Sequence, residues 1–168
     1  HPQPLYLVIK LIEKYYDQPT IAAGIDKTAV VASTANIADT AAISAFCYIG
    51  ENVTVGPGAK IFPNVTIYPG AKIGSHCTIH AGAVIRENVI LEDGCIVQNG
   101  AILGGDGFGY FPHPTDGLVK IPHIGGVVLK RAVEIGANTT VDRGMLGDTV
   151  VGTMSKLDNL VMVGHNVQ

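Results

Sequence analysis

The sequence has few of the large aromatic residues that usually contribute to a protein core. Its 168 residues include no tryptophan, and aromatic residues make up only 6% of the chain. A core without large rings must be built from small, regularly repeated side chains. There are only three cysteines, an odd and low number that argues against a secreted disulfide scaffold and favours a reducing compartment.

Charge and long apolar runs are scarce as well. Charged residues make up 15% of the chain and the formal net charge is −3, so the basic surface of a nucleic-acid-binding protein is not expected. The long uncharged runs contain Gly, Pro and polar residues, which excludes a membrane span of ~20 apolar residues. The chain begins at His1 without Met or a basic leader, which predicts a fragment or a processed chain.

Aliphatic residues, by contrast, are abundant and strictly periodic. In steps of six from Ile25 to Leu103, fourteen consecutive positions hold Ile, Val or Leu. A six-residue period is typical of parallel β-helices, in which three hexads form a triangular coil and like positions stack about 4.8 Å apart. On an α-helix, residues six apart fall on separate faces. The sequence therefore predicts an all-β solenoid filled by stacked aliphatic side chains.

The cysteines fit the same repeat. Cys47, Cys77 and Cys95 each stand two residues before an aliphatic position, where the side chain is small or modest throughout. We expect all three to be core residues. Cys77 and Cys95 are eighteen residues apart and should stack on successive coils.

Two breaks in the period predict the domain organisation. The repeat stops after Leu103 and resumes at Leu129, which predicts a loop inserted at about residues 104–126, and long loops in compact folds are often functional. A shorter slip of four residues precedes Val151. The solenoid is expected to cover residues 25–168.

The first 24 residues follow a different pattern. Leu5, Val8, Ile12 and Tyr15 have the spacing of one apolar helix face, which predicts a short amphipathic helix over residues 4–16. Residues 1–24 are thus expected to form an N-terminal helix and a linker.

Several motifs resemble a known family. They are GGDGFGY at 104–110, KIPHIG at 120–125, VEIGANTTVDRG at 133–144, DTVVG at 148–152 and KLDNLVMVGHNV at 156–167. Together they resemble the UDP-3-O-acylglucosamine N-acyltransferases of lipid A biosynthesis, which belong to the hexapeptide-repeat acyltransferase superfamily.

The resemblance implies a left-handed β-helix, a homotrimer and a location in the bacterial cytoplasm. It also implies that residues 1–24 are the remnant of a preceding uridine-binding domain and that this chain lacks the family's C-terminal extension. The implied reaction moves a 3-hydroxyacyl chain from acyl carrier protein to the 2-amino group of a UDP-linked, 3-O-acylated glucosamine. No cofactor or metal is implied.

The resemblance also suggests site residues. His165, within Gly-His-Asn, matches the catalytic histidine, and imidazole suits a general base because its ordinary pKa of ~6.5 lies near working pH. Asp158, Asn159 and Asn166 are expected to bind substrate or to orient the histidine. Asp158 and Asn159 are equally compatible with turn capping.

Other residues have open alternatives. Phe108 and Tyr110 of the insert are expected either to contact substrate or to pack against a neighbouring subunit. Asp142 and Arg143 are adjacent and are a candidate ion pair. Lys120, Lys130 and Arg131 are candidates for a basic patch that binds the acidic acyl carrier protein.

Three other functions share this fold. The first is a zinc hydratase of the γ-carbonic-anhydrase type, but His76 and His80 are four residues apart and so occupy different hexad positions. The second is an O-acyltransferase on UDP-N-acetylglucosamine, which the Gly-Phe-Gly-Tyr and His-Asn motifs fit less well. The third is an inactive solenoid scaffold.

Overall fold

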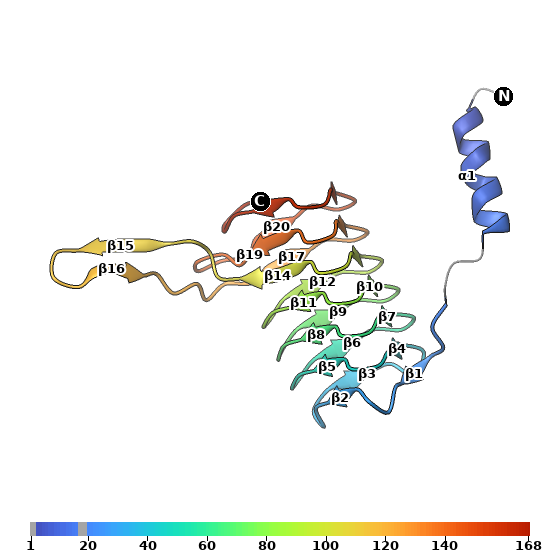
Figure 1. The fold of residues 1–168 in the computed structure, drawn as a ribbon, viewed down its shortest axis with the longest axis horizontal. Helices are drawn as coiled ribbons and strands as arrows, with labels where there is room; N and C mark the ends of the chain where they lie inside the picture. Colours follow the sequence, from blue (N-terminus) through green and yellow to red (C-terminus); the bar gives the residue numbers. More distant parts are fainter. Residues whose placement is uncertain (1–2, 17–19) are drawn as a thin grey trace.

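The computed structural model describes residues 3–16 and 20–168. Most of the described chain winds into a left-handed parallel β-helix whose coils stack along one axis (Figure 1). Each hexad contributes one short strand and one turn, because its β-branched residues favour extended backbone and the turn residues end each strand. The predicted solenoid is confirmed.

Three parallel sheets form the sides of the triangular prism in the described part of the chain. Sheet 1 contains β1 (Gly24–Ile25), β4 (Ala42–Ile43), β7 (Lys60–Ile61), β10 (Thr78–Ile79), β13 (Ile96–Val97), β18 (Glu134–Ile135) and β21 (Lys156–Leu157). Sheet 2 contains β2 (Val30–Val31), β5 (Tyr48–Ile49), β8 (Thr66–Ile67), β11 (Val84–Ile85), β14 (Ile102–Gly105), β19 (Thr140–Asp142) and β22 (Met162–Val163). Sheet 3 contains β3 (Asn36–Ile37), β6 (Thr54–Val55), β9 (Lys72–Ile73), β12 (Ile90–Leu91), β17 (Val127–Leu129) and β20 (Thr149–Val151).

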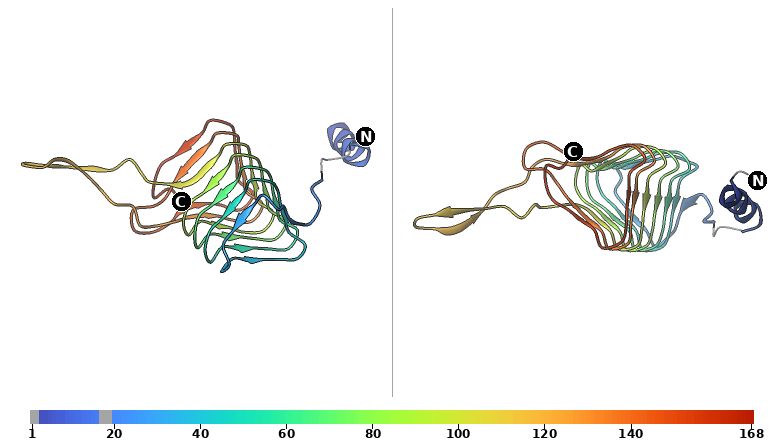
Figure 2. Two further views of the ribbon diagram at one scale, coloured as in Figure 1. Left: turned by 60° about the horizontal axis from the view of Figure 1, so that its bottom comes forward. Right: turned by 90° about the horizontal axis from the view of Figure 1, so that it is seen from above.

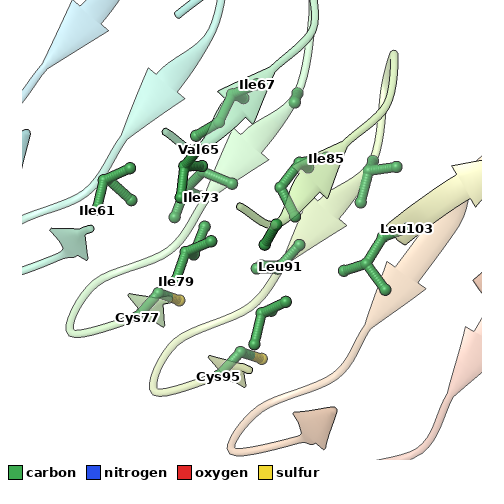
Figure 3. Close-up of a cluster of buried hydrophobic side chains, with 14 of the residues drawn as sticks. Ile61, Val65, Ile67, Ile73, Cys77, Ile79, Ile85, Leu91, Cys95 and Leu103 are labelled. Carbon is green, nitrogen blue, oxygen red and sulfur yellow. The ribbon is translucent and has the colours of Figure 1, made fainter. Parts of the chain in front are cut away.

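The core is a set of stacked aliphatic columns. In sheet 1, Ile61 pairs with Ile79 and Ile79 pairs with Val97, so that like positions lie directly above one another. All three side chains are completely buried. Figure 3 shows these columns pointing into the prism together with Cys77 and Cys95. The three cysteines are buried free thiols, which confirms the prediction that they are core residues.

The turns explain a second feature of the hexads. The residue three positions before each inward aliphatic repeatedly has a positive φ, as at Asn52 (56°), Asn64 (61°) and Gly70 (75°). This left-handed backbone is costly for most L-residues but is tolerated by Gly and Asn. The recurrence of Gly and Asn at this position follows from the turn geometry.

The long insert leaves the prism as an arm. Its two strands, β15 (Tyr110–His113) and β16 (Gly117–Lys120), form an antiparallel hairpin in which every residue is exposed. Figures 1 and 2 show this hairpin projecting away from the coils. The insert does not disturb the sheet, because Ile90 still pairs with Val128 across it.

The N-terminal helix α1 (Pro4–Tyr15) matches the predicted segment and has no buried residue. Pro4 stands in the first turn, where a missing backbone N–H costs nothing. Among the described residues no helix is long and apolar enough to cross a membrane.

Candidate active site at the arm corner

Two corners of the prism carry most of the site residues predicted from the sequence. We call the turns between strands of sheet 2 and sheet 3 the arm corner; they include residues 86–89, 106–126, 143–148 and 164–168. The turns between sheet 1 and sheet 2 are the plain corner; they include residues 98–101, 136–139 and 158–161. The arm corner contains both breaks in the period, and the plain corner contains none.

His165 lies at the arm corner, two residues after the end of β22, and is half-buried. Its Nδ1 lies 2.7 Å from Nδ2 of Asn166. The Oδ1 atom of Asn166 accepts a hydrogen bond from the backbone N–H of Met145 at 2.9 Å, which fixes the amide so that its NH2 group faces His165. The Nδ1 atom of His165 is therefore an acceptor, and the neutral ring carries its proton on Nε2.

His123, near the end of the insert, lies against His165. The two ring centroids are 4.8 Å apart and the rings are inclined at 67°, an edge-to-face contact. His123 is buried, with 6% of its surface exposed. Its Nδ1 lies 2.9 Å from the carbonyl oxygen of Ile121, and because a carbonyl only accepts, Nδ1 carries a proton.

Glycines in the insert make room for this pair. A Cβ atom on Gly107 would lie 2.5 Å from Nε2 of His123 and 2.7 Å from Cδ2 of His165. A Cβ atom on Gly109 would lie 3.0 Å from Cε1 of His123. The two glycines of the Gly-Phe-Gly motif are thus required by the packing of the insert on the histidines.

A carboxylate shares this environment. Asp142 ends β19, and burial raises the pKa of its carboxyl, while the nearby His165 and His123 act to lower it. A histidine pair beside a partly buried carboxylate is an arrangement suited to moving protons.

The Asp142–Arg143 ion pair predicted from the sequence is wrong. Arg143 is the first residue after β19 and is buried, and its guanidinium pairs with Glu87 and not with Asp142. Its guanidinium is 2.6 Å from Oε2 of Glu87 and donates to the carbonyl oxygen of Gly104 at 2.7 Å. Burial alone would raise the pKa of Glu87, but hydrogen bonds from Arg86 and Arg143 outweigh it and lower this pKa to about 2. These bonds tie the base of the insert to the coil below it.

The other predicted residues of the insert lie further out. Phe108 and Tyr110 contact each other edge to face, with ring centroids 5.2 Å apart. Phe108 is 87% exposed, so its ring lies largely outside the chain's own core. Within the described residues, neither ring makes a ring contact with His165.

Asp158 and Asn159 lie at the plain corner, not beside His165. Oδ1 of Asn159 accepts from the backbone N–H of Ala137 at 2.6 Å, and Oδ1 of Asp158 accepts from the N–H of Asn159 at 2.7 Å. Both side chains therefore cap turns, as one of the two interpretations held. They also line a surface cavity of about 520 Å³ together with Gln98, Glu134 and Lys156.

The candidate basic residues do not form one patch. Lys120 lies on the arm and pairs with Asp106 at 2.6 Å. Lys130 follows β17 at the third corner of the prism and pairs with Glu92 at 2.9 Å. Among residues 3–16 and 20–168, no group of three His, Cys, Asp or Glu side chains is arranged to hold a metal ion.

Sequence reasoning missed His123 and the position of Asp142. Both stand inside motifs that carry the resemblance, KIPHIG and TTVDRG. His123 is 42 residues from His165, and its position depends on the path of an aperiodic insert. Asp142 directly follows Val141, an inward aliphatic residue of sheet 2, so the six-residue period does predict its position.

Comparison with known proteins places the chain in a class. Residues 52–87 and 70–105 match the bacterial transferase hexapeptide family, described as six repeats. A solved structure of UDP-N-acetylglucosamine acyltransferase from Arabidopsis is similar in fold, with a TM-score of 0.74 and 21% identity over 85% of this chain and 49% of that one. The chain therefore contains a hexapeptide-repeat domain, folded as a β-helix of the kind found in acyltransferases.

Over part of its length, the chain is more similar in sequence to curated bacterial proteins. The chain is 58% identical over 69 residues to UDP-3-O-acylglucosamine N-acyltransferase of Sinorhizobium fredii, a match that covers 41% of this chain and 20% of the relative. It is 60% identical over 72 residues to the enzyme of the same name from Bordetella parapertussis, again over 41% and 20%. The matched part thus spans about a fifth of the length of these relatives.

Proposed function

We propose that the protein carrying this chain is an N-acyltransferase that moves a 3-hydroxyacyl group from acyl carrier protein to the 2-amino group of UDP-3-O-acylglucosamine. The observation that carries this proposal is the 58% identity over 69 residues with an enzyme of that name. The contact of His165 with Asn166 and His123 supports it, because acyl transfer to an amine needs a positioned base.

The reaction exchanges one acyl bond for another. The amine nitrogen attacks the thioester carbonyl, a C–N bond forms, and the C–S bond breaks to release the thiol. His165 takes the proton that the amine loses and returns it to the departing thiolate. Backbone N–H groups would stabilise the oxyanion of the tetrahedral intermediate.

Asn166 has a defined part in this proposal. While its amide donates to Nδ1 of His165, the ring cannot present a lone pair at Nε2. We infer that substrate binding displaces the amide, either by taking its place at Nδ1 or by letting the proton move to Nδ1. Asn166 then sets the resting tautomer of the base and contacts the substrate only at the site's edge.

In this proposal, the plain corner of a second subunit completes the site. Asp158 and Asn159 lie at a different corner from His165, so within one chain they do not form a single site. In a homotrimer the arm corner of one subunit would face the plain corner of another. The cavity of about 520 Å³ beside Asp158 would then hold part of the sugar nucleotide. The exposed rings of Phe108 and Tyr110 would pack on the neighbouring subunit or on the acyl chain.

The direct test is an acyl-transfer assay on the complete gene product. It uses a 3-hydroxyacyl carrier protein as donor and UDP-3-O-acylglucosamine as acceptor, and compares wild type, His165→Ala and His113→Ala. His113 lies on the exposed arm and serves as the matched control. We expect His165→Ala to lose at least ~100-fold in kcat, the lower range for removing a general base, and His113→Ala to keep wild-type activity.

The outcomes separate the parts of the proposal. Transfer that survives His165→Ala would keep the reaction and reject His165 as the base. Absence of transfer by wild type, with transfer to UDP-N-acetylglucosamine instead, would move the protein to the O-acyltransferases. Absence of both would reject acyltransferase function.

A further inference from the structure

One buried polar atom in the structure lacks a partner. Among the described residues, Nε2 of His123 is the buried side-chain nitrogen or oxygen without a hydrogen bond. Buried polar groups are almost always paired, because water is lost without compensation otherwise. An exception next to a proposed base calls for an explanation in terms of function.

The chemical character of this atom is fixed by the other side of the ring. The Ile121 carbonyl takes the proton of Nδ1, so in the neutral ring Nε2 has a free lone pair. The atom is therefore an acceptor, suited to a ligand N–H or O–H and unsuited to a carboxylate or phosphate oxygen. The described residues offer no group of three ligand side chains here, so a metal is not the partner that this geometry favours.

We propose that His123 is a second substrate-contacting residue, whose Nε2 accepts a hydrogen bond from one N–H of the amine nucleophile while His165 receives the other. This inference rests on the proposed N-acyl transfer. A primary amine has two N–H bonds, and two acceptors bridged by one amine nitrogen lie roughly 5 Å apart when each hydrogen bond is ~3 Å long. The two rings are in edge-to-face contact, and a Cβ on Gly107 would lie 2.5 Å from Nε2 of His123 and 2.7 Å from Cδ2 of His165, so these ring edges border the same space.

The bridge has a consequence for the reaction. With both N–H bonds held, the remaining lone pair of the amine has one direction left, which is toward the thioester carbonyl. Orientation of this kind contributes to the rate by holding the reacting atoms in place. His123 thus binds and orients the amine, and the proton still leaves to His165.

Access to Nε2 is controlled by a glycine. The segment that covers this atom is the one at Gly107, where a Cβ would lie 2.5 Å from Nε2. Gly107 has no side chain, so only the backbone of the insert borders the nitrogen on this side, and the proposal requires this segment to shift when the amine binds. The amine would take the space above this residue.

The test separates hydrogen bonding from packing. His123→Phe keeps an aromatic ring against His165 and removes the acceptor, whereas His123→Gln keeps a polar acceptor. His113→Phe, on the arm, is the matched control. In the complete gene product we expect His123→Phe to lower kcat/KM for the amine acceptor about tenfold, as for a lost hydrogen bond. KM for the acyl carrier protein should not change, and His123→Gln should recover part of the loss.

A second measurement does not depend on the variants folding. The ¹⁵N resonance of His123 Nε2 in histidine-labelled wild type should shift on addition of UDP-3-O-acylglucosamine without donor. An unchanged resonance at saturation, or a His123→Phe protein with wild-type kcat/KM, would overturn the role of His123 while leaving N-acyl transfer intact. Absence of transfer by wild type would overturn both proposals.

Discussion

Asn159 and Asn166 lie at successive corners of the last coil and make the same kind of backbone contact, but their NH2 groups have different surroundings. Oδ1 of Asn159 accepts from Ala137 N–H at 2.6 Å, and Oδ1 of Asn166 accepts from Met145 N–H at 2.9 Å. In both cases the amide of one coil caps the turn of the coil beneath it. At the plain corner the NH2 group of Asn159 has no further partner within the described residues, whereas that of Asn166 faces His165.

The difference comes from what lies outside the turn. At the arm corner the insert returns over the coil and places His123 against His165, which creates a second layer of side chains there. At the plain corner no insert covers the turn. The comparison shows that a turn asparagine of the repeat becomes part of a site when neighbouring residues give its amide something to orient.

The largest effect is expected from glycines at the two corners. Gly107→Ala would place a Cβ 2.5 Å from Nε2 of His123, so the histidine pair must separate. We expect acyl transfer to fall about 100-fold, since a displacement of about 1 Å has that effect on well-positioned groups. The melting temperature should change little. The measurement is kcat together with a thermal melt.

Gly136→Ala is the matched change at the plain corner. Its Cβ would lie 2.5 Å from the backbone nitrogen of Asn159, so the backbone of the coil above must shift. We expect the free energy of unfolding to fall by about 1–3 kcal/mol, as in other overpacked sites. If Gly107→Ala unfolds the protein as much as Gly136→Ala does, the two corners do not differ as proposed.

Variants of the two asparagines, Asn166 and Asn159, should have effects of intermediate size on kcat and compare the two corners directly. Asn166→Asp keeps an acceptor for Met145 N–H, but its carboxylate also accepts from Nδ1–H of His165 and so leaves the lone pair on Nε2. We expect kcat at or above wild type. Asn166→Ala removes the amide donor without supplying an acceptor, so its kcat should lie between those of wild type and Asn166→Asp. Asn159→Asp should leave kcat unchanged.

The same assay that tests His165 measures these variants, and ¹⁵N spectra of the imidazole report the tautomer. A loss in Asn166→Asp as large as that in His165→Ala would show that the amide binds substrate directly. A loss in Asn159→Asp with unchanged stability would give Asn159 the substrate-binding role predicted from the resemblance.

The smallest effect concerns stability against acid. Folding lowers the pKa of Glu87 from 4.5 to about 2, so its ionised carboxylate stabilises the fold above pH 4.5, and this contribution is lost as the pH falls through 2. Glu87→Gln should lower the melting temperature at neutral pH by about 2–4 °C, as a loss of about 1 kcal/mol does in a domain of this size. The difference from wild type should disappear towards pH 2.

Thermal melts between pH 2 and 7 check this. Glu134→Gln, on β18 of sheet 1, is the control. An equal effect of pH on the Glu87→Gln and wild-type melts would show that the Glu87–Arg143 pair does not stabilise the arm corner.

The coils of the β-helix could be predicted from the sequence because a parallel sheet repeats its inward-facing positions at a fixed interval. Ile61 and Ile79 had to stack once the period was recognised, and the structure pairs them. Sequence reasoning placed the insert correctly at the break after Leu103. It did not predict the hairpin, since the strands at Tyr110 and Gly117 follow no hexad period.

The site was only partly predictable for the same reason. His165 and Asn166 are neighbours in sequence, so their contact needs only the turn between them. The contact of His123 with His165, and that of Arg143 with Glu87, join residues far apart through the path of the insert. Asp158 and Asn159 are close to His165 in sequence but lie at another corner, because six residues carry the chain along one side of the triangle.

The register across the insert has a consequence for how such proteins diversify. Ile90 pairs with Val128, and Leu129 with Val151, although both crossings are longer than the eighteen residues of a regular coil. The extra residues leave and return at a corner, so the pairing of the strands on either side does not depend on how many there are. Chain length at this corner is therefore free to vary without refolding the rod. A lineage can therefore lengthen, shorten or exchange the arm while inheriting the scaffold unchanged.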